Sequence, residues 1–244
     1  MNILYKIYSF TIALPLFIIV TIFVSTSVII ASFFGDRDTV SYYLPKFWAK
    51  CATGFFLNPV VVEGRENIKD DESYVFLANH QGYYDIFLAY GYLGHNFKWM
   101  MKEYLRKIPF VGFACARSGQ VYLADGISGI NKAVTQARET LKGGMSMMIF
   151  PEGTRTHDGK MNEFKRGSFM LANEIGVPIV PITINGSFDA FSRHAKSVSH
   201  HPMRITIHKP ITAEERQGKA SKVIMKEVYD IINGGLDEKY RDKG

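Results

Sequence analysis

Apolar residues follow two different patterns along this chain. Near the N-terminus, one apolar segment runs from Phe10 to Phe34 and contains 25 residues without a single charge. Beyond residue 58, short apolar runs alternate with segments in which apolar residues recur at helical spacing. We therefore expect two parts with different surroundings, residues 1–58 and residues 59–244.

The long apolar segment is long enough to cross a bilayer, since as a helix it would measure about 37 Å at about 1.5 Å per residue. A cleaved signal peptide and a buried core helix are the alternatives. However, the run exceeds the usual core of a signal peptide, and Gly35-Asp36-Arg37-Asp38 after it offers no clear cleavage site. We expect a retained membrane anchor, either a span or, because of Pro15 and the Ser/Thr cluster at 25–27, a hairpin within one leaflet.

Residues 39–58 mix aromatic side chains with Lys46 and Lys50. Such a segment suits the headgroup level of a membrane. An ordinary amphipathic helix packed on the domain would have the same composition. Both interpretations remain open from the sequence.

The apolar runs beyond residue 58 predict strands and the periodic segments predict helices. One helix is expected over 129–142, ended by Gly143-Gly144, and another near the C-terminus, followed by a charged tail after Gly234 that we expect to fray. This alternation predicts an α/β fold, with a mixed, largely parallel sheet flanked by helices behind an N-terminal membrane-embedded helical segment. The predicted strands are 60–63, 74–79, 97–101, 120–124, 145–150, 179–184 and 203–208. The apolar faces of the two helices are Ile130, Val134, Ala137 and Leu141, and Ile224, Val228, Ile231 and Ile232.

Composition narrows the function only partly. A chain of 244 residues with 47% hydrophobic content suits one α/β domain with an appendage. The net charge of +6 fits a nucleic acid, an anionic membrane or a phosphorylated substrate, but no long basic run interleaved with aromatics supports nucleic-acid binding. Cys51 and Cys115 form no CxxC motif and lie near no histidine cluster, so neither a disulfide framework nor a metal site is expected.

A histidine and an aspartate lie five positions apart in "ANHQGYYDIF", residues 78–87, directly after an apolar run. In a continuous helix their side chains would lie about 140° apart and could not meet. We therefore expect a turn, with Gly82 in unusual backbone angles and Asp85 at the start of the next helix. Asp85 would then accept a hydrogen bond from His80 and raise its basicity as a general base. The spacing alone also fits a histidine beside an aspartate that caps a core helix.

A second candidate segment is "IFPEGTRT", residues 149–156, which again ends an apolar run. Pro151 and Gly153 predict a turn there. The hydroxyls of Thr154 and Thr156 could face a ligand, and Arg155 offers a planar fork suited to a phosphate. A surface turn with a solvated arginine is the alternative.

Four blocks, in order, resemble the glycerolipid acyltransferases of the 1-acylglycerol-3-phosphate acyltransferase type. The resemblance covers about half of the chain and follows an apolar N-terminal segment that is also usual in this family. Its blocks are "NHQGYYD" (79–85), "KEYLRKIPFVGFACARSGQVYLAD" (102–125), "FPEGTRT" (150–156) and "VPIVPITI" (177–184).

By this resemblance, residues 59–244 are an acyltransferase catalytic domain that needs no cofactor beyond its acyl donor, acyl-CoA or acyl carrier protein. The acceptor would be a lysolipid hydroxyl, with His80 as the base and Asp85 stabilising the imidazolium. The domain would lie on the cytoplasmic face, in contact with membrane lipids. The resemblance places acceptor binding at Asn79, Lys102, Glu152, Gly153, Thr154 and Arg155, and a role in shaping the acyl-chain or donor side at Pro178 and Pro181.

One departure leaves the acceptor open. The second block ends in Ala124-Asp125, where the family usually has Asp-Arg, so the familiar arginine is missing. Nearby cations, Lys102, Arg155 and Arg117, could still bind a phosphate. Lysophosphatidate, acylated to phosphatidic acid, stays the expected acceptor by the resemblance. The alternatives are another lysolipid such as a lyso-aminolipid, a non-catalytic lipid-binding protein, and a lipid hydrolase. We also expect a surface cluster of Lys98, Lys102, Arg106 and Lys107 that attracts anionic groups.

Overall fold

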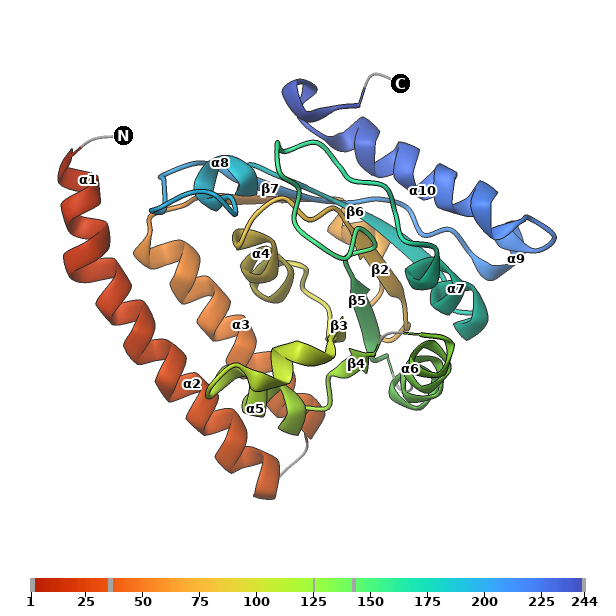
Figure 1. The fold of residues 1–244 in the computed structure, drawn as a ribbon, viewed down its shortest axis with the longest axis horizontal. Coiled ribbons are helices and arrows are strands. Elements are labelled where there is room, and N and C mark those ends of the chain that lie inside the picture. Colours follow the sequence, from red (N-terminus) through yellow and green to blue (C-terminus); the bar gives the residue numbers. More distant parts are fainter. Residues whose placement is uncertain (1–2, 35–36, 125, 142–143, 243–244) are drawn as a thin grey trace.

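The computed structural model describes residues 3–34, 37–124, 126–141 and 144–242. Their central element is one seven-stranded sheet in the order β1-β7-β6-β2-β5-β3-β4 (Figure 1). Within the described residues β6 and β7 are the antiparallel pair, and the other neighbours are parallel. The predicted mixed, largely parallel sheet is confirmed. The strands are β1 (Val60–Glu63), β2 (Val75–Ala78), β3 (Phe97–Lys102), β4 (Val121–Leu123), β5 (Ser146–Ile149), β6 (Ile179–Asn185) and β7 (Met203–Ile207).

Helices cover both faces of this sheet (Figure 1). One face packs against α3 (Arg37–Phe55) and α4 (Tyr84–Tyr92), and the other against α6 (Ile127–Thr140), α7 (Arg166–Ile175) and α10 (Ser221–Gly235). Strand β2 shows the consequence, because Phe76 and Ala78 belong to the first core while Val75 and Leu77 belong to the second. Burial on both sides explains why the strands are continuous apolar runs. The shorter helical elements are α5 (Val111–Arg117), α8 (Ser187–Phe191), α9 (Ala213–Arg216) and three 3₁₀ turns, Arg65–Asn67, Glu103–Lys107 and Glu238–Tyr240.

The two helices predicted from periodicity are confirmed. Helix α6 ends at Thr140, two residues earlier than expected, with Val134 and Ala137 buried on its inner face. Gly143, expected to help end this helix, lies outside the described residues. Helix α10 buries Ile224, Val228 and Ile232 against the sheet.

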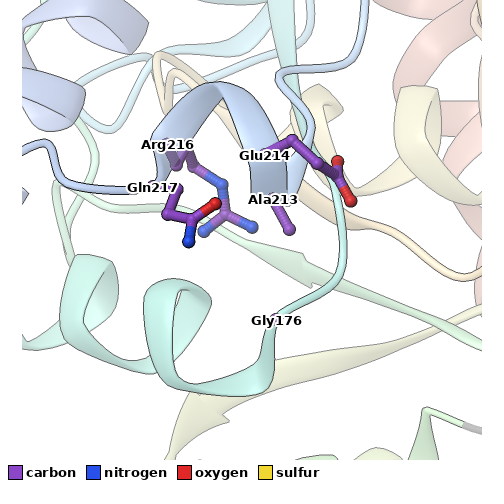
Figure 2. Close-up of a pocket in the computed structure, with 5 residues that line it drawn as sticks. All are labelled: Gly176, Ala213, Glu214, Arg216 and Gln217. Atoms are coloured by element: carbon purple, nitrogen blue, oxygen red, sulfur yellow. The ribbon is translucent and has the colours of Figure 1, made fainter.

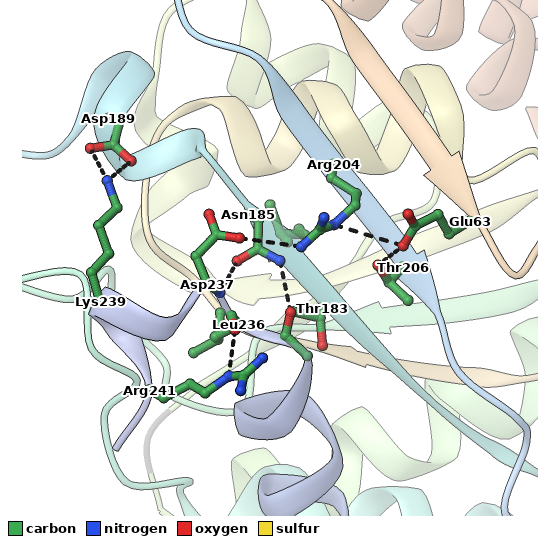
Figure 3. Close-up of polar contacts among 12 residues, drawn as sticks. Glu63, Thr183, Asn185, Asp189, Arg204, Thr206, Leu236, Asp237, Lys239 and Arg241 are labelled. Carbon is green, nitrogen blue, oxygen red and sulfur yellow. Dashed lines mark hydrogen bonds and ion pairs between the residues drawn. The ribbon is translucent and has the colours of Figure 1, made fainter. Parts of the chain in front are cut away.

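The charged tail after Gly234 was predicted to fray. For the residues up to Arg241 this prediction is wrong. The tail turns back over β6 and β7, where the Asp237 N–H donates to Asn185 Oδ1 (2.8 Å) and Arg204 pairs with Asp237 (3.2 Å), as Figure 3 shows. Lys239 bonds Asp189 at 2.9 Å, and Arg241 Nε donates to the Leu236 carbonyl. Asp237 and Lys239 are therefore held by partners remote in sequence, and Arg241 by a carbonyl within the tail itself.

The apolar N-terminal segment forms one helix long and apolar enough to cross a membrane, Ile3–Phe34. It consists of α1 (Ile3–Tyr8), a single π-helical stretch (Ser9–Ala13) and α2 (Leu14–Phe34). The π stretch ends two positions before Pro15, which has no N–H to donate to the preceding turn. Most of this helix is exposed in the described fold, as a lipid-facing surface would be.

Helix α3 runs antiparallel to this long helix (Figure 1). The Tyr8 hydroxyl donates to the Phe55 carbonyl (2.9 Å), and Trp48 Nε1 donates to Thr21 Oγ1 (2.9 Å). Ala49 and Ala52 of α3 are buried. Of the two interpretations of residues 39–58, the helix packed on the domain is therefore present in the structure. The expected boundary at residue 58 falls between α3 and β1.

Candidate active site

The predicted site residues lie where the parallel strands end. His80 follows β2, Glu152 follows β5, and Lys102 is the last residue of β3, the neighbour of β5. Parallel strands bring their carboxyl ends to one edge of a sheet, which is where α/β proteins bind their ligands. The sheet thus gathers segments that are far apart in sequence.

His80 and Asp85 meet as expected. A turn separates β2 from α4, and His80 Nδ1 lies 2.7 Å from Asp85 Oδ2. The same carboxylate oxygen accepts the N–H groups of Gln81 (2.7 Å) and Gly82 (2.9 Å). Asp85 is fully buried, whereas the His80 side chain keeps 14% of its surface exposed. The carboxylate therefore fixes one ring nitrogen of His80, and Nε2 makes no hydrogen bond to any described residue.

The imidazole is also held by stacking. Its ring lies parallel to that of Phe150, with centroids 3.9 Å apart and an interplanar angle of 2°. Phe150 in turn contacts Trp99 of β3, with ring centroids 5.1 Å apart. The ring is thus held on one face and at one edge before any substrate binds.

Gly82 permits this turn for a reason other than the one predicted. Its φ lies outside the left-handed range, so the expected unusual backbone angles are not found. Instead, a Cβ at this position would lie 2.4 Å from the Ser187 carbonyl oxygen and 2.9 Å from that of Phe191. The turn needs glycine because the backbone at the start and end of α8 approaches it closely.

Glu152 holds the backbone of His80 through a hydrogen bond. It is 2% exposed, its Oε1 accepts the His80 N–H (2.6 Å), and its Oε2 accepts two donors from Asn162, the backbone N–H and Nδ2, each at 2.8 Å. Burial raises the pKa of Glu152 to about 8, although the N–H groups of Asn162 and His80 oppose that rise. Both carboxylate oxygens are engaged within the protein, which differs from the expected acceptor contact.

Asn79 is likewise directed inward. Its side chain is fully buried, Nδ2 donates to the Ile184 carbonyl (2.9 Å), and Oδ1 accepts the Ile184 N–H (2.7 Å). The amide therefore joins the end of β2 to β6. It offers no exposed surface to a substrate, in contrast to the expectation that Asn79 contacts one.

The turn after β5 brings Gly153, Thr154 and Arg155 to the same edge. Gly153 has φ +69°, which favours glycine, and its N–H donates to the Phe150 carbonyl (3.0 Å). Thr154 is exposed, and the Arg155 guanidinium lies over the Tyr83 ring at 3.6 Å. Thr156 is buried and its hydroxyl bonds Asp158, so of the two threonines only Thr154 has a side chain open to a ligand.

The expected surface cluster of cations is only partly present. Lys98 is 2% exposed, and its ammonium group donates to the Ser118 carbonyl (2.9 Å) and to Ser41 Oγ, so its inclusion was wrong. Arg106 packs over the Tyr122 ring at 4.0 Å, and Arg117 donates to Ser32 Oγ (3.0 Å), away from the histidine. Lys102 is exposed, and no contact among the described residues joins it to Arg155.

An open cavity of about 400 Å³ lies elsewhere, beside α9 (Figure 2). It adjoins Val177, whose carbonyl accepts Arg216 Nη2 (2.6 Å), just before the start of β6. Because β6 runs parallel to β2, this is the sheet edge opposite His80. Its lining residues are Gly176, Ala213, Glu214, Arg216 and Gln217.

Some residues of the site could not be recognised from the sequence. Asn162 holds Glu152 from ten positions away, and Arg193 donates to the Arg155 carbonyl oxygen from 38 positions away. Neither belongs to an apolar pattern or a turn motif. Among the described residues, no three His, Cys, Asp or Glu side chains gather in a way that could hold a metal ion.

A partly exposed imidazole, oriented by a buried carboxylate at the carboxyl edge of a mostly parallel sheet, is the arrangement of a general base in an α/β enzyme. The Acyltransferase family model matches residues 59–185, which contain this arrangement. The chain belongs to this family.

Relatives agree with this assignment. The chloroplastic 1-acyl-sn-glycerol-3-phosphate acyltransferase of Arabidopsis thaliana is 33% identical over 205 residues, which make up 82% of this chain and 55% of that protein. The 1-acyl-sn-glycerol-3-phosphate acyltransferase of Saccharomyces cerevisiae is 28% identical over 184 residues, 71% of this chain and 59% of that protein. The chain thus spans little more than half the length of these curated relatives.

A solved structure matches over nearly the whole chain. The crystal structure of the 1-acyl-sn-glycerophosphate acyltransferase PlsC from Thermotoga maritima has a TM-score of 0.79 and 30% sequence identity, and the match covers 95% of both chains. The similarity therefore includes the N-terminal helices as well as the sheet.

Proposed function

We propose that this chain transfers a fatty acyl group from a thioester, acyl-CoA or acyl carrier protein, to the free sn-2 hydroxyl of 1-acylglycerol-3-phosphate, giving phosphatidic acid. The observation that carries the proposal is the His80–Asp85 contact, which leaves Nε2 of an oriented imidazole at the exposed side of the turn. The names of the relatives supply the acceptor and the reaction class.

The chemistry needs few groups. His80 Nε2 takes the proton of the acceptor hydroxyl while the oxygen attacks the thioester carbonyl carbon. Asp85 stabilises the imidazolium that forms. When the tetrahedral intermediate collapses, the carbon–sulfur bond breaks and His80 returns the proton to the leaving thiolate. The products are the ester and the free thiol, without a covalent enzyme intermediate.

The backbone around the histidine limits where the oxyanion is stabilised. The N–H groups of Gln81 and Gly82 already donate to Asp85, and the Gly153 N–H donates to Phe150. Donors to the developing oxyanion must therefore come from outside these three positions.

We also propose that the helix Ile3–Phe34 is embedded in a membrane with the catalytic domain on its cytoplasmic face. Its exposed side is rich in isoleucine and phenylalanine, and α5 packs against α2 through Ala114. The segment from the 3₁₀ turn at Glu103–Lys107 to α5 adds further exposed apolar side chains, in a stretch that also contains Lys102 and Lys107. These are Tyr104, Ile108, Phe110 and Phe113.

An acceptor panel tests the reaction. The purified 244-residue chain in detergent micelles is incubated with labelled acyl-CoA, or labelled acyl-acyl carrier protein, and with lysophosphatidate, monoacylglycerol or a lyso-aminolipid. The expected result is labelled phosphatidate, formed fastest from lysophosphatidate. Release of labelled fatty acid would indicate a hydrolase. A faster reaction with the lyso-aminolipid would move the acceptor to that class, and binding without turnover would indicate a lipid-binding protein.

A further inference from the structure

Three segments meet beside His80, and one of them carries an arginine outside the predicted site. The first is the turn 80–83, the second is residues 154–157 and the third is residues 191–193. The Thr156 N–H donates to the His80 carbonyl (2.9 Å), and the Tyr83 N–H donates to the Phe191 carbonyl (3.0 Å). Gly82 and Ser192 form an antiparallel bridge. The segment after α8 is therefore part of the wall of the site.

Arg155 has a donor that the protein does not use. Its guanidinium lies over the Tyr83 ring, and its Nη1 is buried without a hydrogen-bond partner among the described residues. A buried donor without an acceptor is costly, and a guanidinium prefers a carboxylate or phosphate partner. An anionic oxygen would supply the acceptor that this nitrogen lacks among the described residues.

Arg193 reaches the same place from the third segment. Its Nη1 donates to the Arg155 carbonyl (3.3 Å) and faces His157 Nε2 (3.0 Å). No other nitrogen of its guanidinium makes a hydrogen bond to the part of the chain that the structure describes. The His157 ring lies 5.4 Å from that of His194, which adds a second ionisable base.

No carboxylate among the described residues forms an ion pair with any of these four basic side chains. Asp158, which follows His157 in sequence, is turned to its own loop, where it accepts the Thr156 hydroxyl (3.1 Å) and the Lys160 N–H (3.0 Å). The Arg193 guanidinium, held at the backbone of Arg155, adds a second positive charge to this wall of the site. Two such charges match a doubly charged group more closely than a single carboxylate.

We propose that Arg193 is a second cation, acting with Arg155, that binds the phosphate monoester of the acceptor. This inference rests on the proposed function and extends it to a residue that no motif marks. The two guanidinium groups would bind different oxygens of one phosphate, while His157 holds Arg193 in orientation. Lys102, which no described contact joins to Arg155, would then be the more distant cation.

The test compares acceptors with and without a phosphate. With acyl-CoA as the donor, Arg193→Ala is expected to raise the KM for lysophosphatidate about tenfold and to change kcat less than about twofold, as loss of one charge-assisted hydrogen bond would. The KM for monoacylglycerol should not change. Lys196→Ala, which removes one exposed charge from the same loop, is the matched control and should leave both KM values unchanged.

Two further measurements ask whether Arg193 binds the phosphate or only holds two loops together, and whether that phosphate belongs to the acceptor or to the donor. Arg193→Gln keeps an N–H donor for the Arg155 carbonyl but removes the charge, so it should behave like alanine. Recovery of the original KM in this variant would mean that Arg193 only ties the two loops together and would overturn the inference. A KM increase for acyl-CoA that disappears with acyl-dephospho-CoA would place the phosphate on the donor and overturn the acceptor assignment.

The failure of the inference differs from the failure of the proposed function. If the unchanged chain acylates lysophosphatidate and Arg193→Ala has the same KM, only the inference is wrong. If the unchanged chain does not acylate lysophosphatidate, the proposed function is wrong, and glycerol 3-phosphate then serves as the probe in a thermal-shift titration. Arg193 still binds a phosphate monoester if the alanine variant needs about tenfold more of the probe, and does not if both chains respond equally.

Discussion

The two sides of the candidate site differ in how firmly their functional groups are held. On the histidine side, Asp85 Oδ2 accepts three donors and both oxygens of Glu152 are occupied, although Asp85 Oδ1 is buried without a partner among the described residues. On the cation side, Arg155 Nη1 is buried without a partner, and Lys102 is exposed. The base is thus fixed before substrate binds, while the cations have capacity left for an anion. Changes on the first side should affect kcat, and changes on the second should affect KM.

The largest expected effect follows from removing the base. His80→Ala should lower kcat for lysophosphatidate by about 10³-fold, near the middle of the range that general-base catalysis contributes. Asp85→Asn should lower kcat by a smaller factor of about 10²-fold, because the imidazole remains but loses its carboxylate. Both are measured by steady-state kinetics beside a thermal melt. If His80→Ala acylated lysophosphatidate as fast as the unchanged chain, the base assignment would be wrong.

The next effect concerns the space around the turn. Gly82→Ala places a Cβ within 2.4 Å of the Ser187 carbonyl oxygen. The backbone must shift, so we expect a loss of about 1–3 kcal/mol in the free energy of unfolding, together with loss of kcat as His80 moves. Gly54→Ala is the control, because no atom lies within 4 Å of its added Cβ. Equal melting temperatures for the two variants would contradict the close approach of α8.

Glu152 should give the histidine side a dependence of stability on pH. Its pKa is raised by burial to about 8, above its value in the unfolded chain, so the folded state binds the extra proton between these two values. Stability should therefore fall as the pH rises from about 4.5 to about 8, with a slope of up to about 1.4 kcal/mol per pH unit from this group. Melting temperatures of the unchanged chain and of Glu152→Gln, measured across this range, check the prediction. The variant should lack this component, and identical slopes would show that Glu152 does not hold the proton.

The smallest effect is expected on the cation side. Lys102 is exposed, and a charge in water contributes little to binding. Lys102→Ala should raise the KM for lysophosphatidate by about two- to fivefold, and that for monoacylglycerol less, with kcat unchanged. Equal increases for both acceptors would count against a phosphate contact. A drop in kcat would show that the two sides of the site are not separate.

The strands were predictable because their surroundings are simple. Each predicted run matches an observed strand, since the central strands are buried on both faces and thus apolar throughout. The His80–Asp85 contact was also predictable, because only four residues separate the two side chains and one of these is a glycine. Lys98 was placed on the surface from its residue type, but its burial depends on Ser41 and Ser118, which reach it from other elements.

The role of Gly82 and the partners of Glu152 could not be read from local patterns. Both depend on which segments, distant in sequence, pack against residues 80–83 and Glu152. The close approach to Gly82 comes from α8, and Asn162 lies in an irregular segment without periodicity. The same holds for the C-terminal tail, whose charges suggested fraying until their partners on β6 and β7 were known. Local composition predicts the helices and strands. Contacts between segments that are distant in sequence decide which partners the side chains find.

The buried ammonium group of Lys98 has a consequence for any shortened form of the chain. Removing residues 1–58 to obtain a soluble catalytic domain would take away Ser41, one of its acceptors, and Trp48, whose ring contacts Phe87 of α4 (centroids 4.8 Å apart). The cut would thus remove one acceptor of a buried ammonium group and expose an aromatic surface. The N-terminal helices are therefore part of the folded domain, in addition to their proposed attachment to lipid. We expect detergent to solubilise this protein more readily than truncation does.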